Sequence, residues 1–117
     1  MKNKDYIIIQ RIIDYCNDIS DLVMEFGDSY EIFTSKYSYQ LAINMCIIQI
    51  GELASRLSDE IKEVYNIIPW QAVKDMRNFL VHNYGKANLQ QSWYTIKNDI
   101  PELSVYCKNI LIDNGFR

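Results

Sequence analysis

Hydrophobic residues recur at intervals of three and four along most of the chain, which is the period of an α-helix with one buried face. The first such stripe predicts a helix over about residues 5–26, ended by Gly27, a residue typical of helix C-termini. A second stripe predicts a helix over about residues 37–58, and the connector between the two has room for one helical turn. The two stripes consist of Ile8, Ile12, Tyr15, Ile19, Leu22 and Phe26, and of Tyr39, Ile43, Cys46 or Ile47, Ile50, Ala54 and Leu57.

Residues that start and stop helices divide the following part of the chain. Ser58 is suited to cap a short helix over 59–66, whose acidic first residues match the positive end of the helix dipole. Pro69 fits the first turn of the next helix, where its missing N–H is not needed. That helix is expected to end near Gly85. Its apolar face comprises Val73, Met76, Phe79 and Leu80.

The last part of the chain is also helical in pattern. Asn88 is placed to cap a helix, and Pro101 either kinks that helix or begins a final one over 102–113. The inward-facing residues are Leu89, Trp93, Ile96 and Ile100. Repeats, low-complexity tracts and linkers are absent from the sequence. The pattern predicts one all-α domain, residues 1–117, built as an antiparallel bundle of four or five helices.

Composition supports a folded domain. The chain has 117 residues, of which 49% are hydrophobic and 23% charged, with four glycines and two prolines. This length and balance suit one globular domain with a core of its own. Polar residues interrupt every apolar run, and the first residues lack a signal-peptide pattern. We therefore expect a cytoplasmic protein with no membrane segment.

Cysteine, histidine and charge narrow the chemistry. The three cysteines are far apart in sequence and the chain has one histidine, so no metal-ligand set is expected, and reduced thiols fit a cytoplasmic protein. No cofactor-binding pattern is recognised. The net charge of −3 argues against a protein that coats nucleic acids. It leaves room for a local basic cleft, because a phosphate responds to charges within about 8–10 Å.

The single histidine lies in the segment RNFLVHNYG, residues 77–85. If this segment is helical, Arg77 and Tyr84 lie within about 20° of each other around the helix axis, and Asn78 and His82 share a face. Arg77 and His82 differ by about 140°. These two side chains therefore converge only if the helix ends or loosens near His82, or if a second copy of the segment comes alongside.

Two interpretations of this segment stay open from the residues alone. His82 is either a buried residue satisfied by a hydrogen bond beside a salt-bridged Arg77, or part of a catalytic pair. In the second case the planar fork of Arg77 suits a phosphate, and His82 exchanges a proton near neutral pH. Asn78 would orient either one. Such a set suits metal-free phosphodiester cleavage in which the ribose 2′-OH is the nucleophile, and nothing ties a cysteine nucleophile to His82.

The residues Arg77, Asn78, His82 and Tyr84 resemble the Arg-x4-His-x-Tyr motif of the HepT-like branch of the HEPN superfamily, the toxin half of HepT–MntA modules. The resemblance covers about residues 5–112, and the basic Lys86 with Gly85 after the tyrosine is a departure from the pattern. It also rests on IGELASRLSDE (50–60), IPW (68–70), MRN (76–78) and Trp93.

The resemblance implies a HEPN-fold homodimer whose two motifs meet across the interface. It implies a metal-independent endoribonuclease, the toxin of a type VII toxin–antitoxin system, acting on tRNA or mRNA. Arg77 would bind the scissile phosphate, and His82 would be the general base or acid. An MntA-type nucleotidyltransferase would be the antitoxin and would add AMP to Tyr84. A dimer would also gather both copies of Arg77, with Lys74 and Lys86, in one cleft.

Several alternatives remain beside this interpretation. Glu52 is either a supporting partner of Arg77 or an exposed helix carboxylate. Trp70 and Trp93 are expected in the core and not as platforms for stacked bases. The rival function is a non-catalytic HEPN helical subunit that serves as partner or substrate platform of a minimal nucleotidyltransferase.

Overall fold

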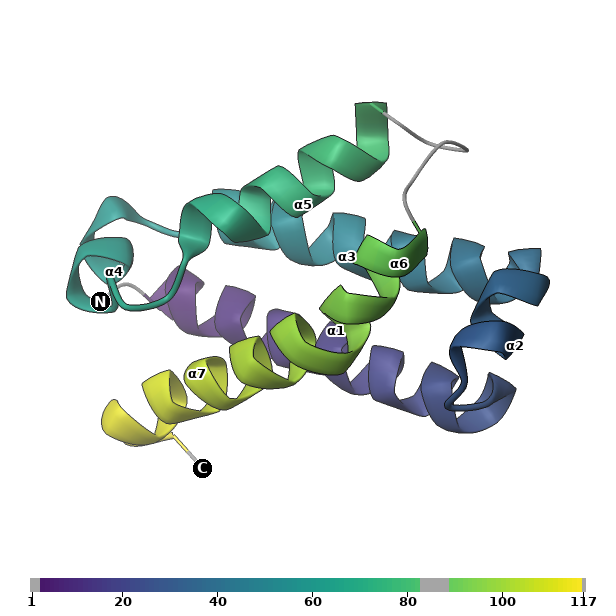
Figure 1. Cartoon of the computed structure of the whole chain (residues 1–117). Helices are drawn as coiled ribbons and strands as arrows, with labels where there is room; N and C mark the ends of the chain where they lie inside the picture. The colour runs from purple at the N-terminus through teal and green to yellow at the C-terminus, as the bar shows by residue number, and fades with distance from the viewer. Residues whose placement is uncertain (1–2, 83–88, 117) are drawn as a thin grey trace.

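The computed structural model describes residues 3–116 except 83–88, and for 79–82 it describes the backbone alone. The described residues form helices joined by short connections and contain no strand, so the all-α prediction is confirmed (Figure 1). The elements are α1 (Asn3–Phe26), α2 (Tyr30–Ser35), α3 (Tyr37–Ser55), α4 (Asp59–Val64), α5 (Trp70–His82), α6 (Leu89–Tyr94), the π-helical η1 (Thr95–Asp99) and α7 (Ile100–Asp113).

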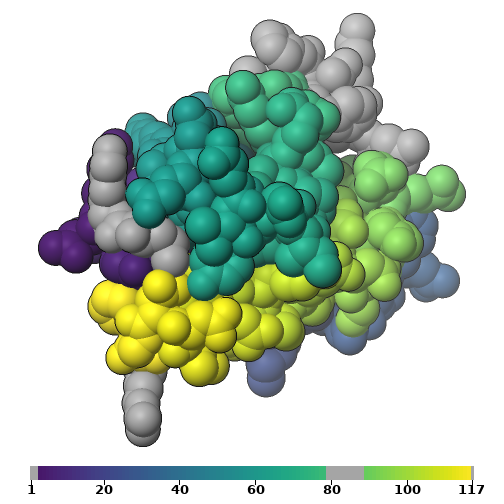
Figure 2. All heavy atoms as spheres, turned by 90° about the vertical axis from the view of Figure 1, so that its left-hand side faces the viewer, coloured from purple at the N-terminus to yellow at the C-terminus, as the bar shows by residue number. Residues whose placement is uncertain are grey.

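Long helices pack side by side and run in alternating directions (Figure 1). The most extensive interfaces join α3 to α5, α1 to α3 and α1 to α7, while α6, η1 and α7 follow one another as a single rod. The link between α4 and α5 lies on the C-terminal end of α7, where Asn114 Nδ2 donates to Tyr65 Oη at 3.0 Å (Figure 2). The described part of the chain is therefore a bundle of four long rods with two short helices at its ends.

The predicted helix ends at Gly27 and Ser58 are confirmed. Gly27 follows α1 with φ 128°, a backbone conformation that favours glycine, whereas the nearest atom to an added Cβ is the tip of the Ile32 side chain, which could move aside. Ser58 caps α4 through a bond from Ile61 N. Its own N–H and hydroxyl donate to the buried carboxylate of Asp5, at 3.0 and 2.6 Å. This contact ties the start of α1 to the junction after α3, which ends at Ser55 and not at 58.

The final helix expected near Pro101 is present, and a change of helical register precedes it. Ile100 N–H donates to Thr95 O, five residues back, so the rod widens to π-helical register over η1. Pro101 then lies in the first turn of α7. Proline has no N–H to donate into the preceding turn, so the regular hydrogen-bond pattern of an α-helix is interrupted at this point. The predicted helix cap at Asn88 lies outside the described residues.

The core matches the predicted stripes. Every residue of the second stripe is buried, whereas Tyr15, Leu22 and Phe26 of the first are half-buried. Trp70 is buried and Trp93 packs on Phe33 with ring centroids 5.4 Å apart, as expected of core residues. Within residues 3–82 and 89–116, no helix is long and apolar enough to cross a membrane.

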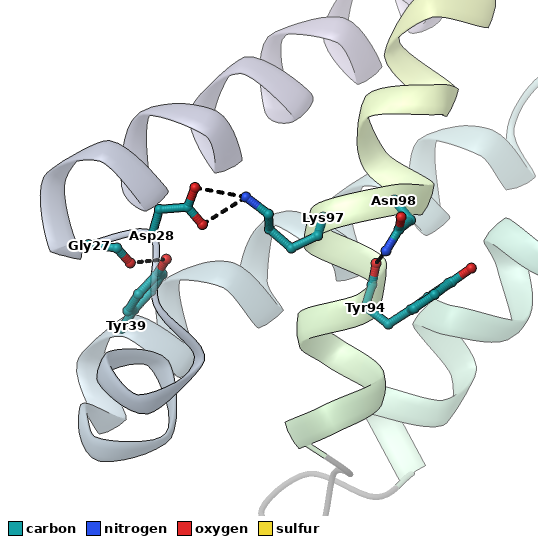
Figure 3. A network of polar contacts seen from close by, with 6 residues as sticks. All are labelled: Gly27, Asp28, Tyr39, Tyr94, Lys97 and Asn98. Atoms are coloured by element: carbon teal, nitrogen blue, oxygen red, sulfur yellow. Dashed lines mark hydrogen bonds and ion pairs between the residues drawn. The ribbon is translucent and has the colours of Figure 1, made fainter.

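A polar network fastens the π-helical segment to the corner between α1 and α2 (Figure 3). Lys97 Nζ pairs with Asp28 at 2.7 Å and lies 5.8 Å from the ring centroid of Trp93. The Tyr39 hydroxyl donates to Gly27 O at 3.2 Å. The Lys97–Asp28 pair holds η1 against the corner that follows α1, and the Tyr39–Gly27 bond joins the same corner to α3.

The three cysteines, one each on α1, α3 and α7, are buried free thiols. Burial raises the pKa of Cys16 to about 12, of Cys46 to about 11 and of Cys107 to about 12. A thiol is nucleophilic only as thiolate, so these cysteines are inert at neutral pH in the folded protein.

We predict that all three thiols of the folded protein react with Ellman's reagent at pH 8 only as fast as the chain unfolds. The pKa of these thiols is 9.0 in the unfolded chain and about 11 to 12 in the folded protein, so the folded protein holds their protons more tightly. This difference adds to the free energy of unfolding below pH 9.0, and the added stability is lost as the pH rises from 9.0 to about 12. The measurement is absorbance during labelling in native buffer and in guanidinium. Labelling that is equally fast in both would contradict the prediction.

Candidate active site

Arg77 lies where α3 and α5 cross. Its side chain passes over Gly51, a buried residue in the C-terminal half of α3. Gly51 has no Cβ, so the stem of Arg77 lies directly against the backbone of α3. This close approach carries the guanidinium group to the neighbouring residue, Glu52.

Glu52 and Arg77 form an ion pair. Arg77 Nη1 lies 3.0 Å from Glu52 Oε1, with 21% of the arginine side chain and 36% of the glutamate side chain exposed. Of the two interpretations of Glu52, the structure favours a partner of Arg77 over an exposed carboxylate without a contact. A pair this exposed contributes only about 0.2–1 kcal/mol to stability. In this structure the pair directs the guanidinium group towards the C-terminal part of α3.

The ion pair leaves part of the guanidinium group available. It uses one of the five N–H groups, and Arg77 Nε is buried with no hydrogen-bond partner. Buried donors are rarely left unpaired, but this nitrogen has almost no exposed surface, so an anion would have to bind the other N–H groups of the guanidinium. The planar guanidinium group can donate two parallel hydrogen bonds to a phosphate, which a single-point donor cannot do.

The other predicted residues follow Arg77 along α5. Asn78 is half-buried beside it, and α5 stays regular until His82, its last residue. Five residues of helix separate Arg77 from His82 by about 7.5 Å along the axis and about 140° around it. The side chain of His82, and Tyr84 altogether, lie outside the described residues. Glu52 and Arg77 are thus the predicted site residues that the structure places in contact.

Charge around Arg77 is balanced within one chain. Glu52 compensates the guanidinium, and Lys74, one turn earlier on α5, is an exposed cation. Asp75 accepts a hydrogen bond from Gln71 at 2.9 Å on the same helix. Among the described residues, no three histidine, cysteine, aspartate or glutamate side chains gather as a metal-ion site.

The sequence also contains a signal outside the motif, a long stretch of α3 without charge. From Tyr37 to Gly51, α3 has no charged residue, and Glu52 is the first. Its outer face carries half-buried Leu41 and Ile48 and the exposed Met45, at 56%. A surface helix normally carries charge on its outer side. The charge-free face leads along α3 directly to the Glu52–Arg77 pair.

Comparison with known proteins finds a family and several relatives whose names all refer to ribonucleases. The family model "Ribonuclease HepT-like" matches residues 12–110. A Thermococcus cleftensis protein named "Probable ribonuclease HepT" is 32% identical, covering 77% of this chain and 86% of its own. A "Putative RNase" of Caldanaerobacter subterraneus subsp. tengcongensis is 31% identical, covering 88% and 90%. One of Methanocaldococcus jannaschii is 29% identical, covering 87% and 86%.

No solved structure matches the chain. The family match covers most of the described bundle, from α1 to α7, and includes both Glu52 and the segment from Arg77 to Tyr84. Two relatives above 30% identity align over more than three quarters of this chain. The chain therefore belongs to the HepT-like ribonuclease family.

Proposed function

We propose that this protein is a metal-independent endoribonuclease, the toxin of a type VII toxin–antitoxin system. The observation that carries the proposal is the position of Arg77, which pairs with Glu52 at the crossing of α3 and α5 and keeps 21% of its side chain exposed to a possible anion. Membership of the HepT-like ribonuclease family supports RNA as the substrate. The target is tRNA or mRNA.

The residues suit cleavage by internal transfer. The ribose 2′-OH attacks the adjacent phosphorus, the P–O5′ bond breaks, and the products are a 2′,3′-cyclic phosphate and a 5′-OH end. His82 acts as general base for the 2′-OH proton or as general acid for the leaving oxygen. Arg77 stabilises the charge that develops on the phosphate, and Asn78 orients the pair. Glu52 supports Arg77 through the ion pair.

We expect His82→Ala and Arg77→Ala to lower RNA cleavage by about 10²–10⁴-fold each, since each removes a group that acts in the transition state. The assay uses total RNA in EDTA with analysis of the 3′ ends, and cyclic phosphate is expected there. Gln71→Ala, an exposed substitution on the same helix, is the control and should stay active. Full activity of His82→Ala, or strict dependence on Mg²⁺, would exclude the mechanism.

A homodimer would complete this site. An isologous interface places the same face of both copies against each other, so a charged face would meet like charges near the two-fold axis, whereas the charge-free face of α3 would not. Pairing along Leu41, Met45 and Ile48 would extend to Arg77. It would supply a second guanidinium group beside each His82, which a single regular helix cannot bring close to its own Arg77.

We expect light scattering to show a dimer at micromolar concentration, with the segment 69–85 at or near the interface. Met45→Lys would place like charges on the apolar face and should shift the protein towards monomer. Met24→Lys is the matched control, because Met24 is an 81% exposed methionine on α1. A wild-type monomer under these conditions would count against the dimer, and equal effects of both variants against this face.

The balance of charge at Arg77 also supports the alternative function, a non-catalytic partner or substrate platform of a minimal nucleotidyltransferase. Glu52 offsets Arg77, and the chain as a whole is acidic. Both functions include a nucleotidyltransferase partner. Growth arrest on expression of this chain alone, lost in His82→Ala, separates the toxin from the platform.

Control of the site is proposed to act through Tyr84. A nucleotidyltransferase of the MntA type would transfer AMP from ATP to the tyrosine oxygen, with release of pyrophosphate. The new phosphodiester carries one negative charge, which would compete with substrate phosphate for the fork of Arg77. The nucleoside would also block the path of the RNA.

We expect wild-type protein co-expressed with the antitoxin to gain one or more AMP units on the peptide containing residues 78–86. Tyr84→Phe should gain none and should stay toxic, because it keeps the ring and loses the acceptor oxygen. Tyr94→Phe, which alters an exposed tyrosine of α6, is the matched control and should be modified and silenced like wild type. Intact mass spectrometry measures the gain. Neutralisation without modification would remove the switch role of Tyr84.

A further inference from the structure

Gly51 occupies a position where its backbone does not require glycine. Among the described residues, the positive φ angles belong to Gly27 and Gly115, so Gly51 has an ordinary helical conformation. A glycine inside a helix lowers stability relative to alanine, because the unfolded chain loses more freedom on folding. The reason for Gly51 must therefore lie in the space around it.

The space at Gly51 is filled by Arg77. A Cβ added to Gly51 would lie 2.8 Å from Arg77 Cγ, closer still to Arg77 Cβ, and 3.4 Å from the carbonyl oxygen of Val73. Arg77 Cβ is bonded to the backbone of α5 and cannot rotate out of the way. A side chain at position 51 can be accommodated only by moving α5 relative to α3.

The same turn of α3 contacts Arg77 at two points. Gly51 lies against the first two carbons of the side chain, and Glu52 pairs with its guanidinium group. The buried Nε lies between these contacts along the side chain. The direction of the guanidinium fork is thus set at its base by a steric contact and at its end by an ion pair. Loss of the ion pair alone would leave the steric contact in place.

We propose that Gly51 is a positioning residue for Arg77: its missing side chain sets where the guanidinium group meets a phosphate. The catalytic part of this inference rests on the proposed ribonuclease function, whereas the steric part does not. A displacement of about 1 Å at a reacting centre lowers a rate by about 10²-fold. A methyl group at position 51 should therefore impair cleavage without touching substrate.

A thermal unfolding cycle tests the contact independently of function. Gly51→Ala should lower Tm by at least about 5 °C in the wild-type background. In Arg77→Gly, which removes both contacting carbons, the same change should raise Tm, because alanine favours helix. Lys74→Gly is the matched control on α5, and there Gly51→Ala should still lower Tm.

The outcomes of the cycle separate clearly. A change of sign confined to the Arg77→Gly background supports the contact, and equal losses in the Arg77→Gly and Lys74→Gly backgrounds overturn it. If Gly51→Ala does not fold alone, recovery of folding in Arg77→Gly supports the contact. Failure to fold in both backgrounds overturns it.

Cleavage kinetics below the Tm of each variant then test the positioning role. Gly51→Ala should lower kcat by about 10- to 100-fold with a smaller change in KM. It should cause no further loss in Arg77→Gly, because its effect acts through Arg77. A folded Gly51→Ala protein with wild-type kcat would overturn the positioning role. If wild-type protein does not cleave RNA, the proposed function fails, and the thermal cycle alone decides whether Gly51 positions Arg77.

Discussion

The crossing of α3 and α5 at Gly51 is the constraint on which the candidate site depends. The two helices share the most extensive interface of the bundle, and at Gly51 the stem of Arg77 lies against helix backbone. Packed helices do not deform continuously, so the position of this contact fixes the register of α5 on α3. That register in turn brings Glu52 to Arg77.

Periodicity predicted the helices because burial of an apolar stripe is a local property of the sequence. The stripes of α1 and α3, the stop at Gly27 and the cap at Ser58 all follow from residues close in sequence. The π-helical register before Pro101 and the early end of α3 at Ser55 did not follow, since α3 stops where Ser58 turns towards Asp5, more than fifty residues away. Such choices depend on tertiary contacts that no spacing reveals.

In the candidate site, too, some features follow from residues close in sequence and others from contacts between helices. The motif pointed to Arg77, but spacing left Glu52 with two interpretations, because Glu52 and Arg77 belong to different helices. Gly51 had a signal of its own, an isolated glycine inside a strongly apolar helix, which usually has a packing reason. The reason itself became visible only with α5 in place. His82 and Tyr84 lie beyond what the structure describes at the level of side chains.

Charge gives the last link between this geometry and the proposed activity. One chain supplies Arg77 with its compensating Glu52 within a protein of net charge −3, which is a poor electrostatic trap for RNA. The half-exposed ion pair contributes little, so a phosphate can share the guanidinium at small cost. Two copies joined along the uncharged face of α3 would place two such forks in one region of low charge. Binding of RNA would then depend on the two arginines gathered in one place, although the protein as a whole is acidic. It would also depend on the contact at Gly51, which sets the direction of each guanidinium group.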